Sequence, residues 1–95
     1  MEVLTDQEVQ SQLGRRPGWT GQGTTIEREF EFADFLTAVA FVDRVAEEAQ
    51  RRDHHPDLLI HGYNKVKVTL TTHSEGGVTA KDFDLAGAID GLEDR

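Results

Sequence analysis

Residues 34–52 carry a long amphipathic pattern, which constrains the fold more than any other feature of the chain. Apolar residues recur there at the spacing of an α-helix, and charged residues take the opposite side. Asp34 can cap the start of such a helix, and Pro56 prevents it from continuing. The pattern predicts one central helix, with an apolar stripe of Phe35, Ala38, Val39, Val42, Val45, Ala46 and Ala49.

Alternating apolar and polar residues, typical of half-buried antiparallel strands, flank this helix on both sides. Residues 26–32 form one strand, and residues 58–63 and 65–72 form a pair whose turn places Asn64 in a left-handed conformation. Trp19 is expected to pack on the core from a short edge strand, followed by a turn over residues 20–23. The outward side of the strand over residues 26–32 is predicted to be a polar face, open to solvent or part of a subunit contact, formed by Glu27, Glu29 and Glu31.

Two capping-box patterns predict the remaining helices. Thr5 with Glu8 starts a short helix that ends near Leu13, and Thr79 with Asp82 starts the last helix. The order is therefore α-β-β-α-β-β-α. It indicates an α+β fold, with a four-stranded antiparallel sheet and three helices packed on one face. The 95 residues are expected to form a single domain over residues 1–95.

Composition narrows the function classes. The net charge of −8 disfavours direct binding to nucleic acid, whose phosphates are also negative. The chain has no cysteine, which excludes disulfides, thiolate metal sites and a cysteine nucleophile. No apolar stretch approaches the roughly 20 residues of a membrane span, and the first residues do not resemble a signal peptide. A cytoplasmic protein is the expectation.

Four histidines carry the most informative chemistry, since imidazole both gives and takes protons near neutral pH. His54 and His55 are adjacent and stiffened by Pro56. A hairpin centred on Asn64 would place His55 opposite His73, so that three imidazoles converge at one end of the sheet. A one-residue shift in the register of this hairpin would change which residue lies opposite His55, but the three histidines would remain at the same end of the sheet. His61 falls near the turn and is expected to be a solvated polar residue.

The residues leave three interpretations of this cluster open: a proton-transfer site, a metal site or a polar turn. Imidazole binds zinc, copper and nickel, but adjacent residues on an extended segment point to opposite faces, and His-x-x-x-His spacing is absent. Proton transfer is therefore favoured over metal binding. Asp82 can orient a histidine, although its position in a capping box also explains it structurally.

Several spaced motifs together resemble the pterin-4a-carbinolamine dehydratases over nearly the whole chain. They are Asp53-His54-His55-Pro56, Tyr63-Asn64-Lys65-Val66, Thr69-Leu70-Thr71-Thr72-His73, and Gly77 and Thr79 leading to Asp82. The resemblance implies a four-stranded antiparallel sheet with three helices on one face. It also implies a lyase reaction in tetrahydrobiopterin recycling, in which 4a-hydroxytetrahydropterin loses water to give quinonoid dihydropterin. No cofactor and no metal are expected.

The resemblance also implies a site. The expected catalytic residues are His54, His55 and His73, with Asp82 in support. The expected substrate-binding residues are Asp53, His54, His55, Pro56, Thr71, Thr72, His73 and Ser74. Gln50 departs from the family, which often has an acidic or basic residue there, and Leu58-Leu59 indicates a bacterial type of pocket wall.

The same resemblance implies partners. They are a small-molecule pterin, a second copy in a homodimer or homotetramer, and an aromatic amino-acid hydroxylase in the same pathway. The charge and the lack of a long apolar stretch predict that neither nucleic acid nor a membrane is a partner. The alternative function is a non-catalytic dimerisation or assembly partner that uses the same fold.

Overall fold

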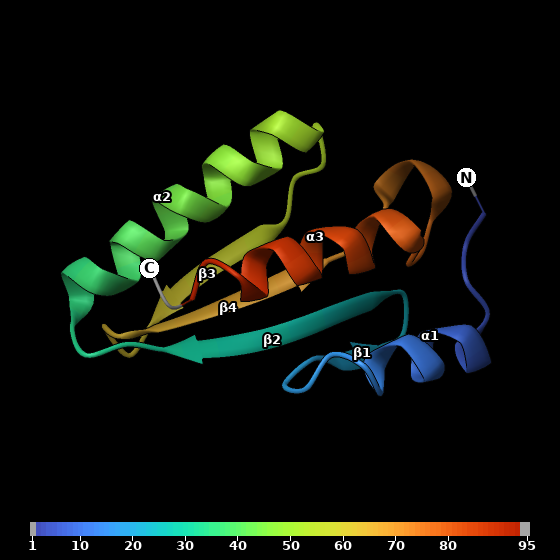
Figure 1. Ribbon diagram of the computed structural model, residues 1–95, viewed down its shortest axis with the longest axis horizontal. Helices are drawn as coiled ribbons and strands as arrows, with labels where there is room; N and C mark the ends of the chain where they lie inside the picture. Colours follow the sequence, from blue (N-terminus) through green and yellow to red (C-terminus); the bar gives the residue numbers. More distant parts are fainter. Residues whose placement is uncertain (1, 94–95) are drawn as a thin grey trace.

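The computed structural model describes residues 2–93 and contains the predicted order of elements (Figure 1). The helices are α1 (Asp6–Leu13), α2 (Phe35–Arg52) and α3 (Ala80–Asp90), with a short 3-10 turn η1 (His73–Glu75) before α3. The strands are β1 (Thr20–Gln22), β2 (Thr25–Glu31), β3 (Asp57–His61) and β4 (Lys65–Leu70).

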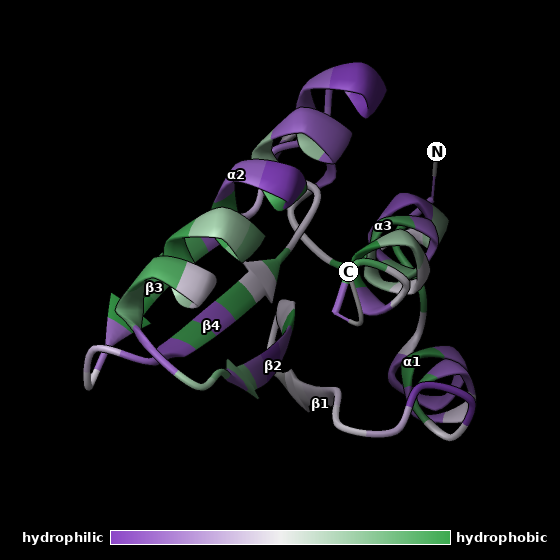
Figure 2. Ribbon diagram, turned by 60° about the vertical axis from the view of Figure 1, so that its left-hand side comes forward, coloured by the Kyte–Doolittle hydropathy of each residue, from purple (hydrophilic) through white to green (hydrophobic). Residues whose placement is uncertain are grey.

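The four strands form one sheet in the order β1-β2-β4-β3, and all neighbouring strands are antiparallel. The helices lie on one side of this sheet (Figures 1 and 2). The predicted α+β architecture is therefore confirmed. Among residues 2–93, no helix combines the length and apolar character needed to span a bilayer.

The core lies between the sheet and the two longer helices. β4 alternates between buried and half-buried positions, and Figure 2 shows it as successive apolar and polar bands. Phe41 of α2 is fully buried, with ring centroids 4.8 Å from Phe30 of β2 and 4.9 Å from Phe32, the residue after β2. The buried residues of α2 and α3 that complete this core include Ala38, Val45, Ala49, Phe83, Leu85, Ala86 and Ile89.

The buried stripe of α2 differs from the prediction. Phe41 is fully buried but is not part of the predicted stripe, whereas Phe35 and Ala46 belong to that stripe and are exposed. Phe35 is the first residue of α2 and lies beyond the edge of the core, with 51% of its surface exposed. Helical spacing alone located the helix but misjudged by part of a turn which side faces the sheet.

The predicted caps are confirmed, because they depend only on residues three positions apart. Thr5 and Glu8 form a capping box, as do Thr79 and Asp82. Asp34 caps α2 by accepting a hydrogen bond from the backbone N–H of Thr37 at 2.8 Å. Hydrogen bonds from the side chain and backbone of Thr37 lower the pKa of the Asp34 carboxyl.

Two predicted turns are wrong in detail. Residues 20–22 form β1, so only Gly23 and Thr24 remain for the turn before β2. In the turn between β3 and β4, Gly62 and Tyr63 have left-handed backbones (φ 56° and 59°), and Asn64 does not. Asn64 is instead buried, and its side-chain amide donates to the carbonyl of Phe32 at 2.9 Å.

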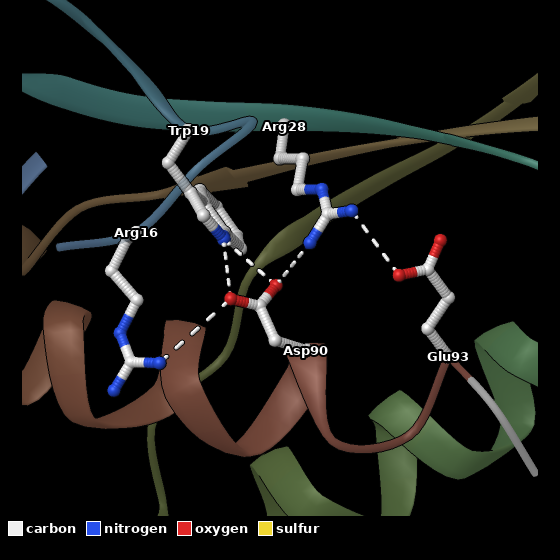
Figure 3. A network of polar contacts seen from close by, with 5 residues as sticks. All are labelled: Arg16, Trp19, Arg28, Asp90 and Glu93. Carbon is white, nitrogen blue, oxygen red and sulfur yellow. Dashed lines mark hydrogen bonds and ion pairs between the residues drawn. The ribbon is translucent and has the colours of Figure 1, made fainter. Parts of the chain in front are cut away.

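A polar network joins the end of α3 to Arg28 of β2 and to Trp19, directly before β1 (Figure 3). The Asp90 carboxylate accepts hydrogen bonds from Trp19 Nε1 at 2.9 Å and from Arg28 Nη1 at 2.6 Å. Arg28 also contacts Glu93 at 3.1 Å and covers the ring of Phe30. This explains how Arg28, on the apolar side of β2, is accommodated.

Replacing Asp90 with alanine is expected to lower the free energy of unfolding by about 1–3 kcal/mol, because partly buried donors on Trp19 and Arg28 lose their acceptor. Urea denaturation followed by Trp19 fluorescence measures this change. Asp90→Asn is the matched control, since it keeps one acceptor oxygen and should lose less. A change below about 0.5 kcal/mol in the alanine variant, the range of ordinary surface substitutions, would show that the network contributes little to stability.

Candidate active site

Three segments meet at the end of the sheet shown on the right of Figure 1: the end of α2, the end of β4 and the start of α3. They enclose a pocket of about 320 Å³. Its lining contains seven of the eight residues expected to bind substrate, and it is made of Asp53, His54, His55, Thr71, Thr72, His73, Ser74 and Lys81. A hollow of about 590 Å³ along α2 is larger, but no histidine lines it.

Local backbone geometry brings the histidines to this pocket. Asp53 ends α2 in a left-handed conformation (φ 49°), and the N–H of His54 then bonds to the carbonyl of Ala49 at 3.1 Å. This reversal directs His54 and His55 back toward the sheet. On the other side, Thr72 forms an isolated bridge with Gly77, and His73 lies in the intervening turn η1.

The predicted pairing of His55 with His73 is wrong. Lys67 lies opposite Leu59, whereas a hairpin centred on Asn64 would place it opposite His61. The register is shifted by two residues because the turn is built on Gly62 and Tyr63, and the ladder ends before the histidines are reached. A shift by an even number of residues keeps each side chain on its face, and His54, His55 and His73 still line one pocket.

A buried carboxylate, that of Asp82, contacts the ring of His54. Asp82 has no exposed surface, and its Oδ1 lies 2.6 Å from His54 Nε2. Its Oδ2 accepts from the hydroxyl of Thr72 and the N–H of Thr79, both at 2.9 Å. An ionised carboxylate only accepts hydrogen bonds, so His54 Nε2 is the donor when Asp82 is ionised, and Nδ1 is the ring nitrogen left outside this contact.

The other two histidines lie in a different environment. His55 and His73 are exposed, whereas the side chain of His54 is only 11% exposed. His55 Nε2 lies 3.1 Å from the side-chain oxygen of Gln50. Gln50 therefore contacts His55 and presents a neutral amide to it. The pocket thus combines one largely covered imidazole with two that are open to solvent.

Some of the expected binding groups are not available. Pro56 does not line the pocket, and the hydroxyl of Thr71 is donated to the carbonyl of Thr24 at 2.7 Å. Lys81, which the sequence analysis missed, contributes a cation to the wall. Its position directly before Asp82 at the start of α3 is the signal that could have indicated it.

A second hollow of about 250 Å³ adjoins the pocket and shares His54 and Lys81 with it. Arg52 lines this hollow and bonds to Glu48 at 2.9 Å. Hydrogen bonds from Arg51 and then Arg52 lower the pKa of the Glu48 carboxyl.

The fourth histidine and the polar strand face lie elsewhere. His61 bonds to Glu29 across the outer face of the sheet, so it has a partner that the sequence analysis did not predict. Glu27 lies 3.5 Å from Lys67 on the same face. Within residues 2–93, no group of three or more acidic or histidine side chains is arranged to hold a metal ion.

Comparisons with known proteins agree on one family. The family model described as "Pterin 4 alpha carbinolamine dehydratase" matches residues 2–92. A protein from Picosynechococcus named "Putative pterin-4-alpha-carbinolamine dehydratase" is 52% identical over 89 residues, covering 94% of this chain and 96% of its own length.

Solved structures show the same fold. The structure titled "transcriptional coactivator/pterin dehydratase" from Brucella melitensis has a TM-score of 0.90 and 38% identity, and the match covers 97% of this chain and 99% of the other. A pterin dehydratase-like protein, described as a RuBisCO assembly factor in the alpha-carboxysome, has a TM-score of 0.64 at 21% identity, covering 79% of this chain and 86% of its own. At that identity the second likeness shows the fold alone.

Proposed function

The chain belongs to the pterin-4a-carbinolamine dehydratase family, and from this premise we propose that it removes water from 4a-hydroxytetrahydropterin to give quinonoid dihydropterin. The observation that carries this proposal is the pocket lined by three imidazoles, one of which is bonded to a buried carboxylate. Groups of this kind suit proton transfer near neutral pH.

The proposed reaction needs two proton transfers. The C4a–O bond breaks, and the leaving hydroxide takes a proton from an acid and departs as water. A base removes the proton from the adjacent ring N–H, whose electron pair forms the new C=N bond. One proton is given and one is taken, so the pair of imidazoles returns to its starting state once a proton passes between them.

The environments of the histidines suggest how these roles divide. His54 is held by Asp82 with Nε2 protonated, which leaves Nδ1 able to act as the base. His55 and His73 are exposed and can be protonated from solvent, so one of them serves as the acid.

The remaining lining groups are proposed to hold the pterin. A pocket of about 320 Å³ lies at the lower end of the range for small-molecule sites, roughly 300–1,000 Å³. Asp53 and the backbone of Thr71, His73 and Ser74 offer acceptors and donors to the edge of a planar ring, and Lys81 offers a cation to its carbonyl oxygen. Because aromatic amino-acid hydroxylases release the substrate, we place the reaction in tetrahydrobiopterin recycling in the cytoplasm.

Titration with a pterin that cannot dehydrate, such as 7,8-dihydrobiopterin, tests the proposed site. In NMR spectra, the signals of the hydrogens on the ring carbons of His54, His55 and His73 should shift and then saturate as the pterin is added. The corresponding signals of His61 should not shift. Equal movement of all four histidines, or of none, would contradict a pterin site at this pocket.

Large exposed apolar side chains support a second copy of the chain as a partner, which is compatible with the dehydratase function and with the alternative, a non-catalytic assembly role. Phe35 and Leu36 begin α2, and Leu59 and Tyr63 belong to the edge strand β3 and the turn that follows. We propose that a second copy of this chain covers these residues, giving a homodimer or homotetramer. Sedimentation equilibrium should then give a multiple of 10.6 kDa, and a monomer at micromolar concentration would contradict this.

A further inference from the structure

Three polar side chains are buried beneath the pocket and contact one another. Thr72 is 6% exposed, and Thr79 and Asp82 have no exposed surface. The Thr72 hydroxyl oxygen lies 2.9 Å from Asp82 Oδ2 and 2.8 Å from the hydroxyl oxygen of Thr79. Buried polar groups of this kind are costly unless each finds a partner.

The hydrogens of this cluster have one consistent arrangement. A threonine hydroxyl has one hydrogen, and an ionised carboxylate has none, so Thr72 donates to Asp82. The hydroxyl of Thr79 then donates to Thr72, and accepts in turn from the N–H of Lys81 at 3.3 Å. With two donors on Oδ2, the negative charge of Asp82 is stabilised, and Oδ1 is left to accept from His54.

Thr72 has no polar group to spare for a ligand. Its backbone N–H bonds to the carbonyl of Gly77 at 3.0 Å, and its carbonyl accepts from the N–H groups of Glu75 and Gly76, both at 3.0 Å. Its hydroxyl is committed to Asp82. Thr72 can therefore contact the pterin only by van der Waals packing, because its polar groups form hydrogen bonds within the protein.

We propose that Thr72 is a positioning residue: its hydroxyl holds the Asp82 carboxylate so that Oδ1 faces His54 and fixes the tautomer of that ring with the proton on Nε2. The effect on rate rests on the proposed function, because it matters only if His54 Nδ1 is the base. The tautomer of His54 can be measured whether or not the chain is an active enzyme.

Thr72→Val and Thr72→Ser test this. Valine has the shape of threonine without the hydroxyl, whereas serine keeps the hydroxyl. Nitrogen-15 NMR of the histidine rings should show the Nε2-protonated form of His54 in the parent and in Thr72→Ser, and a mixture of forms in Thr72→Val. Thr69→Val, on β4 outside the pocket, is the matched control and should leave the tautomer unchanged.

The kinetic constants of the variants should change in parallel with the tautomer of His54. In Thr72→Val, kcat should fall by about 10- to 100-fold, the range of a lost hydrogen bond to a charged group, while KM changes little. Thr72→Ser should recover most of kcat, which a merely structural role would not predict, because serine packs less well than valine.

The outcomes separate the two claims. An unchanged His54 tautomer in folded Thr72→Val would overturn the positioning role, whatever the activity of the parent protein. A shifted tautomer supports the positioning role even if the parent chain proves inactive, in which case only the proposed reaction fails.

Discussion

Replacing His54 with alanine is expected to lower kcat for carbinolamine dehydration by about 10²- to 10⁴-fold, the usual contribution of a general acid or base. The change removes the proposed base, and it also leaves Asp82 Oδ1 without its partner. KM should change less than kcat, because the loss falls mainly on the transition state. Stopped-flow absorbance of the decaying carbinolamine measures both constants.

His61→Ala is the matched control for this variant. His61 is an imidazole on β3 that bonds to Glu29 on the outer sheet face and does not line the pocket. Its replacement should leave kcat within about twofold, since surface substitutions away from a site usually act weakly. Wild-type kcat in His54→Ala would show that this imidazole takes no part in the reaction.

Replacing Asp82 with alanine is expected to lower both stability and activity. Three donors, on His54, Thr72 and Thr79, lose their acceptor at a fully buried position, and the contact with the Thr79 N–H is also the Asp82 half of the capping box of α3. Each buried donor left unsatisfied costs about 1–3 kcal/mol, so a loss of about 3–5 kcal/mol is expected after partial relaxation. That is a large part of the roughly 5–15 kcal/mol that stabilises a small domain.

Asp82→Asn separates the two effects. Asparagine keeps the shape and one acceptor oxygen, but its NH₂ group must face either His54 or the donors on Thr72 and Thr79. Urea denaturation should show a smaller loss of stability than in Asp82→Ala, while kcat still falls by about 10²-fold or more. Activity that tracks stability in both variants would argue for a purely structural carboxylate.

Local patterns predicted the elements of this fold because their causes are local. The capping box of Thr79 and Asp82 joins residues three positions apart, and the alternation along β4 follows from the geometry of a strand. The register between β3 and β4 could not be predicted in the same way. It depends on the contact of Asn64 with Phe32, 32 positions away, which holds Asn64 at the sheet and leaves Gly62 and Tyr63 to form the turn.

The candidate site shows the same division. The adjacent His54 and His55 and the distant His73 were identified from residue type and approximate topology, which tolerate an error of two residues in register. The hydrogen-bond partners of individual polar atoms could not be predicted from the sequence. Thr72 was expected to bind substrate, but its hydroxyl bonds to Asp82, and this preference depends on the packing of α3 against the end of β4.

The most direct test of the proposed function is the decay of 4a-hydroxytetrahydropterin in the presence of the purified chain, compared with its spontaneous decay. We expect an acceleration that is proportional to protein concentration, saturates with substrate, and is lost in a variant with His54, His55 and His73 all replaced by alanine. Decay at the spontaneous rate at every protein concentration, with the chain folded, would contradict the proposed dehydratase function.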